Sequence, residues 1–250
     1  MAAVLQTEAL CKSFGALTVA ERIDFRLEAG ARHALIGPNG AGKTTFVNML
    51  MGVVRPSSGR ILLAGEDVTR APQAARVKAG LGRTFQITTL FRSLPVLDNV
   101  ALAVAERRGS AHGMWKPASS YKNVIEESED LLSTLGIAED ARVPVADLPY
   151  GKQRLVEIAI ALGLKPKVLL LDEPAAGVPS EEAGIILRTL EKLPSSIAIL
   201  IIEHDMDLVF RFARRITVLV QGQVLVEGAP EEVRRDRRVH EVYLGEPHHG

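Results

Sequence analysis

One segment constrains the fold of this chain more than any other, because it combines a spaced set of glycines with a basic and a hydroxyl residue. It follows the pattern G-x-x-x-x-G-K-[ST] and runs Gly37-Pro38-Asn39-Gly40-Ala41-Gly42-Lys43-Thr44. An apolar run at 34–36 precedes it, and a helical stretch at 44–50 follows. Glycines let a loop curl until its N–H groups converge, and a helix N-terminus adds partial positive charge. The segment therefore predicts a phosphate-binding loop between a buried strand and a helix.

The side chains at the end of this loop indicate a nucleoside triphosphate bound together with a metal ion. Lys43 supplies a full positive charge beside the phosphates, and the Thr44 hydroxyl is the expected Mg²⁺ ligand. A second motif supports this, because the apolar run 168–171 ends in two carboxylates, Asp172 and Glu173. Ligands of open α/β sheets bind at the carboxyl ends of the strands. We therefore expect Asp172 to hold Mg²⁺ and Glu173 to act as general base on water.

Hydrophobic patterns elsewhere predict both buried and half-buried strands. The continuous apolar runs 168–171 and 197–202 are typical of parallel strands that are buried on both faces, with a crossover helix between them. Apolar residues alternate with charged ones at 23–28, which predicts a half-buried strand. The runs 216–220 and 223–226 flank Gln221-Gly222 and predict a hairpin with a two-residue turn.

The middle of the chain has a different pattern. From about 90 to 164 the sequence contains no apolar run typical of a buried strand. It contains helical patterns at 96–105, 124–135 and 155–164, and the composition of 109–120 predicts a loop. We therefore predict an α/β nucleotide-binding core that carries an inserted helical subdomain. The expected bounds are 1–89 and 165–229 for the core, 90–164 for the subdomain and 230–250 for a C-terminal tail.

Composition narrows the classes of partner. The 250 residues include 30 basic and 30 acidic side chains, so the formal net charge is +0. A neutral chain has no overall field that attracts nucleic acid or anionic lipid, so we expect no nucleic-acid partner. The single Cys11 cannot form an internal disulfide, which suits a reducing compartment. The first residues lack a signal-peptide pattern, and the apolar run 197–202 is far shorter than the roughly 20 residues that span a bilayer. We expect a cytoplasmic protein.

The order and spacing of these and further motifs resemble the ATP-binding subunit of an ABC transporter, over essentially all 250 residues. Phe14, 29 residues before Lys43, lies where the family has an aromatic that stacks on adenine. Gln86 resembles the glutamine that contacts Mg²⁺ and the attacking water and senses the membrane partner. His204, in Glu203-His204-Asp205-Met206, resembles the switch histidine that touches the γ-phosphate. The resemblance implies a phosphate-loop ATPase core with N-terminal antiparallel strands and an inserted α-helical subdomain.

A segment that resembles the family's signature motif completes the resemblance, but its residues differ from the usual motif. The segment Leu148-Pro149-Tyr150-Gly151-Lys152-Gln153 lies where the family usually has Leu-Ser-Gly-Gly-Gln, whose serine meets the γ-phosphate held by the other subunit. Pro149 replaces that serine, and Pro179 stands where an aspartate often crosses the dimer. These departures put the contact across the dimer in question. The helix N-terminus at Gly151 still offers N–H groups to an anion.

The resemblance thus implies a complete set of site residues. The catalytic residues would be Glu173, His204 and Gln86, and the Mg²⁺ ligands would be Thr44, Gln86 and Asp172. The residues implied to contact ATP are Phe14, Gly37, Pro38, Asn39, Gly40, Ala41, Gly42, Lys43, Thr44, Thr45, Tyr150, Gly151 and Lys152. Two of these residues have plain structural alternatives, which are a place in the hydrophobic core for Phe14 and a helix-cap role for His204.

Short sequences at several motifs narrow the branch. Gly-Arg-Thr-Phe-Gln, Asp-Glu-Pro-Ala-Ala-Gly, Ile-Glu-His-Asp-Met and the tail 239–246 resemble importers of branched-chain and related hydrophobic amino acids. The family works as a pair of ATPase subunits, identical or homologous, on two transmembrane permeases, with an external solute-binding protein. We therefore expect a peripheral position on the inner face of the membrane. The stretch 86–99, with Leu90 and Phe91, is expected to face the permeases, although these two residues also suit a core pair.

Other functions remain as alternatives. The ATPase of a lipopolysaccharide-export transporter has a similar tail, but an ordinary Leu-Ser-Gly-Gly signature is expected there. A regulator that binds nucleotide without turnover is disfavoured because Glu173 and His204 are present. An ABC ATPase of DNA repair or translation is disfavoured by the absence of tandem domains or a long coiled coil. A GTPase is disfavoured because no Asn-Lys-x-Asp segment occurs.

Overall fold

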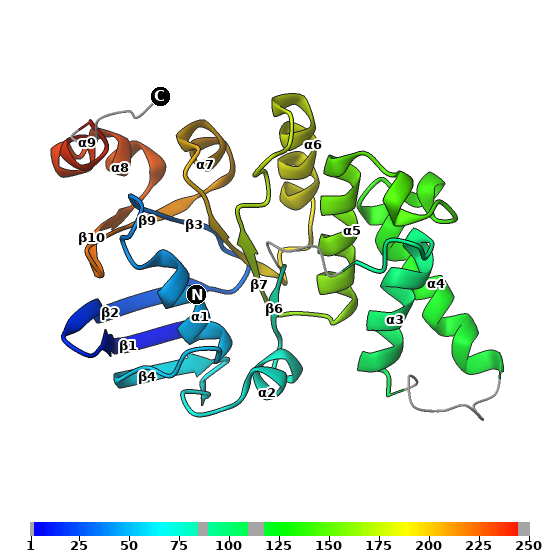
Figure 1. Cartoon of the computed structure of the whole chain (residues 1–250), viewed down its shortest axis with the longest axis horizontal. Coiled ribbons are helices and arrows are strands. Elements are labelled where there is room, and N and C mark those ends of the chain that lie inside the picture. Colours follow the sequence, from blue (N-terminus) through cyan, green and yellow to red (C-terminus); the bar gives the residue numbers. More distant parts are fainter. Residues whose placement is uncertain (1–2, 85–89, 110–117, 245–250) are drawn as a thin grey trace.

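The computed structural model describes residues 3–84, 90–109 and 118–244. Its strands are β1 (Ala3–Phe14), β2 (Leu17–Glu28), β3 (Arg32–Ile36), β4 (Ser58–Leu63), β5 (Glu66–Asp67), β6 (Leu81–Arg83), β7 (Val168–Asp172), β8 (Ala198–Ile202), β9 (Arg215–Val220) and β10 (Gln223–Gly228). They form an antiparallel sheet in the order β2-β1-β4-β5 and a second sheet in the order β10-β9-β3-β8-β7-β6 (Figure 1). The second sheet is parallel apart from β10 at its edge. The expected fold class is confirmed.

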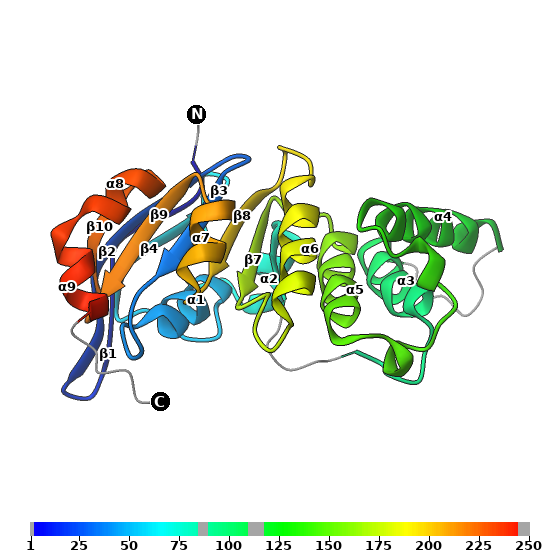
Figure 2. The same ribbon diagram turned by 90° about the horizontal axis from the view of Figure 1, so that it is seen from above.

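Helices cover the parallel sheet and extend beyond it. They are α1 (Lys43–Met51), α2 (Gln73–Lys78), α3 (Val96–Arg107), α4 (Ala118–Thr134), α5 (Tyr150–Gly163), α6 (Ser180–Glu191), α7 (Met206–Phe212), α8 (Pro230–Arg235) and α9 (Arg237–Leu244), with short 3-10 helices at Ala138–Asp140 and Val145–Asp147. Figure 2 shows α3 and α4 at the end remote from the antiparallel sheet, and α8 and α9 at the opposite end of the molecule. In the described part of 90–164 the regular elements are all helical.

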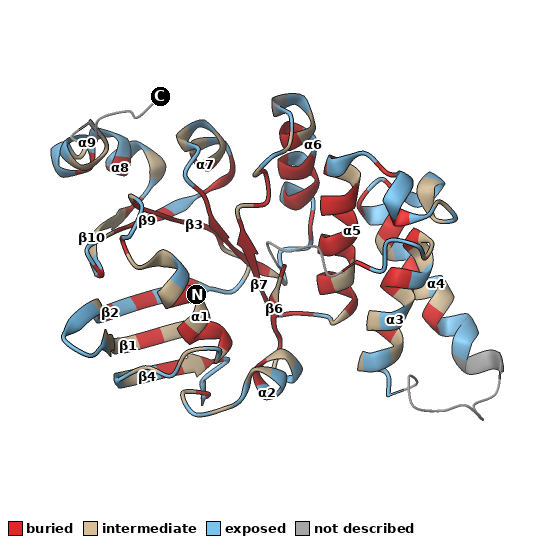
Figure 3. Ribbon diagram, viewed as in Figure 1, coloured by how far each residue is buried: buried red, intermediate tan, exposed pale blue. Residues whose placement is uncertain are grey.

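The parallel sheet is buried on both faces. β3, β7 and β8 are buried along their whole length (Figure 3). Leu170 and Leu200 belong to a core shared with Phe46 of α1 and the antiparallel sheet. Leu169 and Leu171 belong to a second core, to which α5, α6 and α7 contribute. Because each strand has apolar neighbours on both sides, its sequence is a continuous apolar run, as predicted.

Two local predictions are confirmed in detail. In β2 the residues Ile23, Phe25 and Leu27 are buried and their charged neighbours are exposed. β9 and β10 form the predicted hairpin, with φ values of 48° at Gln221 and 80° at Gly222. Positive φ at both turn residues matches the right-handed twist of the strands that they join.

Two predicted boundaries are wrong. α4 begins at Ala118, although the loop was expected to continue to 120. Small residues such as alanine and serine are well tolerated in the first turn of a helix, so the loop-like composition is misleading there. α5 begins at Tyr150, five residues before the predicted start. Pro149 is its N-cap with φ of −54°, a value that proline imposes and that suits entry into a helix.

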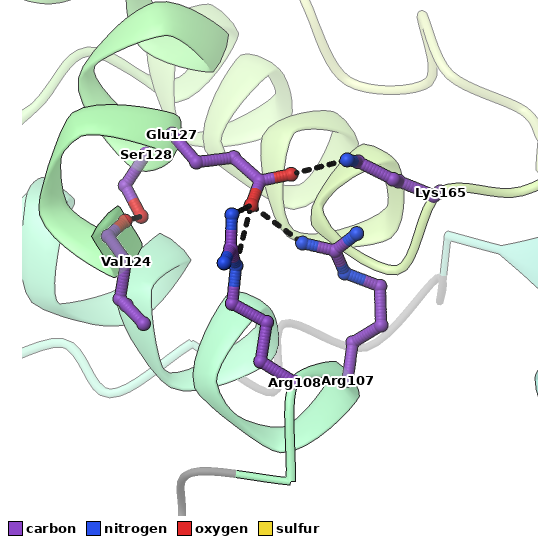
Figure 4. Close-up of polar contacts among 6 residues, drawn as sticks. All are labelled: Arg107, Arg108, Val124, Glu127, Ser128 and Lys165. Carbon is purple, nitrogen blue, oxygen red and sulfur yellow. Dashed lines mark hydrogen bonds and ion pairs between the residues drawn. The ribbon is translucent and has the colours of Figure 1, made fainter. Parts of the chain in front are cut away.

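A cluster of charged side chains ties the helical subdomain together. Glu127 of α4 accepts bonds from Arg107 and Arg108 at the end of α3, at 2.6 and 2.7 Å, and from Lys165 after α5 at 3.0 Å (Figure 4). Burial alone would raise the pKa of Glu127, but the three cations together lower it to about 2. One carboxylate therefore joins three segments that are distant in sequence.

The C-terminal helices complete the core beside the hairpin. Val233 of α8 and Val239 of α9 are buried in the core that the parallel sheet shares with α5, α6 and α7. Across 3–84, 90–109 and 118–244, none of the helices has the length and apolar character needed to cross a bilayer.

Candidate functional site: a nucleotide site at the carboxyl edge of the parallel sheet

The phosphate loop lies where the sequence places it, between the end of β3 at Ile36 and the start of α1 at Lys43. Glycine is required at two of its positions. A Cβ atom at Gly37 would collide with the carbonyl oxygen of Leu219, and φ there is 153°. A Cβ atom at Gly42, with φ of 99°, would lie 2.5 Å from the carbonyl oxygen of Val19. The loop can therefore keep this shape only with glycine at both ends.

The start of α1 directs hydrogen-bond donors into the loop. The N-cap is Gly42, which has no side chain that could accept bonds from the first N–H groups of the helix. The N–H groups of a first helical turn have no acceptor within the helix, and they carry the positive end of its dipole. The Lys43 Nζ atom lies over the same loop, where it donates to the carbonyl oxygens of Gly37 and Pro38 at 2.5 and 2.9 Å. These donors fit a chain of phosphates.

The acidic residues lie beside this loop. β7, β8 and β3 are parallel neighbours, so Asp172 at the end of β7, His204 after β8 and the loop after β3 meet at one edge of the sheet. Asp172 is 6% exposed, and its Oδ2 atom accepts a bond of 2.7 Å from Arg83. The same guanidinium donates to Asn48 Oδ1 on α1 at 2.9 Å. Arg83 therefore connects the acidic strand end to the helix of the phosphate loop.

Sequence reasoning missed the roles of Arg83 and Asn48. In the sequence, Arg83 is part of a short motif typical of the branch, and Asn48 belongs to none of the motifs. The available clue was the position of Arg83 at the end of a short strand beside β7. That adjacency exists only once the strands are paired.

Glu173 and His204 face each other. The Nδ1 atom of His204 lies 3.5 Å from Oε1 of Glu173, and their side chains are 66% and 33% exposed respectively. The N–H group of Glu173 donates to the carbonyl oxygen of Ile202 at 2.9 Å, which ties the ends of β7 and β8 together. Both side chains are therefore accessible to solvent at the edge where the phosphate loop opens.

The donor set fits Mg²⁺ held jointly with phosphate. Within the described residues, no group of three or more His, Cys, Asp or Glu side chains is arranged to hold a metal ion. Mg²⁺ in phosphate sites commonly keeps several waters and takes one or two protein ligands in addition to phosphate oxygens. Thr44 on α1 and Asp172 on β7 supply a hydroxyl and a carboxylate at the same edge of the sheet.

The signature segment lies elsewhere. α1 and α5 are separated by other elements in both views of the molecule (Figures 1 and 2). The Gly151 N–H group, predicted to meet an anion, donates to Oε2 of Glu182 on α6 at 3.0 Å. A carboxylate of the same chain thus occupies one amide at the start of α5. Tyr150 is 39% exposed, and its hydroxyl accepts a bond of 2.7 Å from Arg154.

Lys152 is paired with the helical subdomain. Its Nζ atom lies 2.7 Å from Oδ2 of Asp140 and 3.5 Å from Oε1 of Glu139. The bond with Asp140, followed by the attraction of both carboxylates, raises the pKa of Lys152. The structure therefore shows Lys152 in ion pairs within its own chain, and its contact with ATP stays a prediction.

Three further predictions concern Phe14, the pair Leu90 and Phe91, and Gln86. Phe14 is 51% exposed with Lys12 Nζ 4.6 Å from its ring centre, so the alternative that it belongs to the core is wrong. Leu90 is buried and Phe91 is 59% exposed, so they do not form a core pair. Gln86 lies outside the described residues.

Comparisons with known proteins agree with this geometry. A family model described as "ABC transporter" matches residues 20–176, and one described as "Branched-chain amino acid ATP-binding cassette transporter" matches 223–249. The high-affinity branched-chain amino acid transport ATP-binding protein BraF of Pseudomonas aeruginosa is 35% identical over 97% of this chain and 98% of its own. The chain belongs to the ABC transporter family.

Solved structures support the same assignment. The ADP conformation of an ATP-binding cassette of an ABC transporter superposes with a TM-score of 0.85 at 29% identity, and covers 98% of this chain and 100% of its own. The chain is an ABC cassette that binds ATP, and its hydrolysis of ATP is coupled to transport. A bacterial ABC transporter cassette of the same fold, 22% identical to this chain with a TM-score of 0.75, forms a dimer in its solved structure.

The branch is decided by the C-terminal match. The lipopolysaccharide export system ATP-binding protein LptB of Acidithiobacillus ferridurans is 36% identical over 98% of both chains, so overall identity does not separate the two alternatives. The model that matches 223–249 is described as a branched-chain amino acid cassette, and the relatives BraF and LivG, each 35% identical over 97% of this chain, carry the same description. The chain therefore belongs to that branch.

Proposed function

We propose that this cassette hydrolyses ATP with bound Mg²⁺ to drive the uptake of branched-chain or related hydrophobic amino acids. The observation that carries the proposal is the contact between Glu173 and His204, 3.5 Å apart, beside Asp172 and the phosphate loop. The C-terminal match and the relatives of the same branch support the choice of solute.

The residues of this chain divide the work of hydrolysis. Lys43 and the N–H groups of the loop hold the β- and γ-phosphates. Thr44 and Asp172 would hold Mg²⁺, which neutralises charge on the phosphates when bound. Glu173 accepts the proton of the attacking water, and His204 contacts the γ-phosphate beside it. Gln86 is proposed on sequence grounds to contact the metal and the water.

Two cassettes are needed to enclose each nucleotide. The phosphate loop and the signature helix are remote from each other within one chain (Figure 1). We propose that the start of α5 from a second cassette, identical or homologous, closes over the ATP bound at the first. Tyr150, Gly151 and Lys152 would then contact nucleotide across the dimer, where Gly151 would exchange Glu182 for phosphate.

The cassette pair acts on membrane partners. We propose that two transmembrane permeases dock on the helical subdomain, with exposed Phe91 at the contact, and hold the cassettes at the inner face of the membrane. A solute-binding protein would deliver the amino acid to the permeases without touching this chain. The balanced charge gives no support to a nucleic-acid partner.

The role of Glu173 is tested by Glu173→Gln. This variant keeps the size of the side chain but cannot accept a proton, so ATP turnover should fall at least a hundredfold while ATP binding remains. Glu181→Gln removes an exposed carboxylate from α6 and is the control for charge. Turnover at the wild-type rate in Glu173→Gln would exclude Glu173 as the base.

The solute is tested by transport. Co-expression of the cassette with its permeases and solute-binding protein, in cells that lack their own branched-chain importer, should restore uptake of labelled leucine or a related amino acid. Glu173→Gln should abolish that uptake. A cassette that restores lipopolysaccharide export and no amino-acid uptake would overturn the assigned solute.

A further inference from the structure

A buried carboxylate bonded to the loops of the two proposed catalytic residues has no assigned part in the mechanism. Glu203, directly before His204, is 2% exposed. Burial raises the pKa of Glu203, and the N–H groups of Ala175 and His204 act against that rise. A carboxylate in such a place is costly unless specific donors hold it, so its partners indicate its use.

The two donors belong to the two loops that carry the proposed catalytic residues. The Oε1 atom of Glu203 accepts a bond from the Ala175 N–H group at 3.3 Å. The Oε2 atom accepts one from the His204 N–H group, also at 3.3 Å. Ala175 follows Glu173 by two residues in the loop after β7. One carboxylate therefore bridges the segment after Glu173 and the segment that begins at His204.

The loop after β7 needs such support. Glu173 has φ of 47°, in the left-handed region that non-glycine residues seldom adopt. Such a conformation is strained for a residue with a Cβ atom and persists only where surrounding contacts fix it. The N–H group of Glu173 is bonded to Ile202, and Glu203 adds a second connection one peptide beyond Pro174. The backbone at Glu173 is therefore strained, and the hydrogen bonds from the N–H groups of Glu173 and Ala175 hold it in place.

We propose that Glu203 is a positioning residue, which holds Glu173 and His204 at the separation that hydrolysis requires. The inference rests on the proposed function, because it assumes that those two residues act on the water and the γ-phosphate. A carboxylate suits the task since it offers one acceptor oxygen to each N–H group. A glutamine of the same shape has one acceptor oxygen and one donor group, so it can satisfy only one of the two loops.

The test compares Glu203→Gln with wild type on the purified full-length chain at saturating Mg²⁺-ATP. We expect kcat to fall about tenfold to a hundredfold, as when orienting partners are removed from other sites. The dissociation constant for ATP should stay within twofold, because the phosphate loop is unaltered. A lowered kcat with unchanged ATP affinity is the result that a purely structural role would not produce.

Glu227→Gln is the matched control. Glu227 is also a carboxylate held by neighbours, with Arg215 at 2.6 Å and Thr217 at 2.8 Å, but it lies on β10 away from the proposed catalytic loops. Its variant should keep the wild-type kcat even if its melting temperature falls. If Glu203→Gln keeps the wild-type kcat, or loses activity only in proportion to ATP affinity, positioning by Glu203 is refuted. The proposed function fails separately, through wild-type turnover in Glu173→Gln.

Discussion

Replacing Glu127 by glutamine should destabilise the helical subdomain through loss of a single charge. Three cations from two segments, Arg107 and Arg108 at the end of α3 and Lys165 after α5, converge on this carboxylate (Figure 4). The Glu127 side chain is 15% exposed. Arg107, 21% exposed, depends on it most, because its buried Nε atom has no hydrogen-bond partner among the residues that the structure describes. Removing one member of a buried pair leaves the other charge uncompensated.

The expected magnitude follows from the pKa of Glu127, which falls from 4.5 to about 2 in the folded chain. A shift of about 2.5 units corresponds to roughly 3.4 kcal/mol of stabilisation of the ionised form. Arg108 and Lys165 are 38% and 65% exposed, so solvent screens part of that energy. We expect Glu127→Gln to lower the free energy of unfolding by about 2 kcal/mol at pH 7.

Urea unfolding of wild type and Glu127→Gln at several pH values is the assay. A lowered folded-state pKa stabilises the protein fully above the unfolded value of about 4.5 and loses that effect as the pH falls toward 2. The difference between the two proteins should therefore be constant from pH 6 to 8 and shrink below about pH 4.5.

The neighbouring Glu126 provides the control for this experiment. Its side chain is 56% exposed and pairs with Lys122 at 3.7 Å, so Glu126→Gln should cost less than about 0.5 kcal/mol. A loss below about 0.5 kcal/mol in Glu127→Gln at pH 7, or a difference that stays the same down to pH 3.5, would refute the reasoning.

Two further predictions concern the nucleotide. Phe14→Ala should weaken ATP binding about fivefold to a hundredfold in a titration calorimeter, because stacking on a base is worth about 1–3 kcal/mol. Leu17→Ala, which also removes an exposed apolar side chain, is the control, and unchanged affinity in Phe14→Ala would exclude stacking. Glu182→Ala should lower the ATP concentration needed for dimerisation in gel filtration about tenfold, because it removes the carboxylate that bonds to the Gly151 N–H group. Glu181→Ala is the control, and a higher requirement for ATP in Glu182→Ala would show that Glu182 supports the dimer.

Local patterns predicted much of the fold because each one reports a local physical demand. The loop at 37–44 needs glycine where backbone atoms crowd it, and the runs at β7 and β8 are apolar because both faces of the sheet are covered. Short strands such as β4 and β6 were not predicted. They depend on pairing with β1 and β7, which are distant in sequence, and their own residues carry little periodicity.

The candidate site also has features that the local sequence predicts and features that depend on contacts between distant segments. By itself, the sequence determined the residue types that bind phosphate and carry acid–base chemistry, since these occur as short contiguous motifs with typical spacing. Only the tertiary structure decided which groups meet. Arg83 pairs with Asp172, Glu182 accepts a bond from the Gly151 N–H group, and Glu203 accepts bonds from two loops. Each of these contacts joins segments brought together by strand pairing or helix packing. Residue spacing along the chain carries no record of such proximity, and so the geometry of the site had to come from the fold.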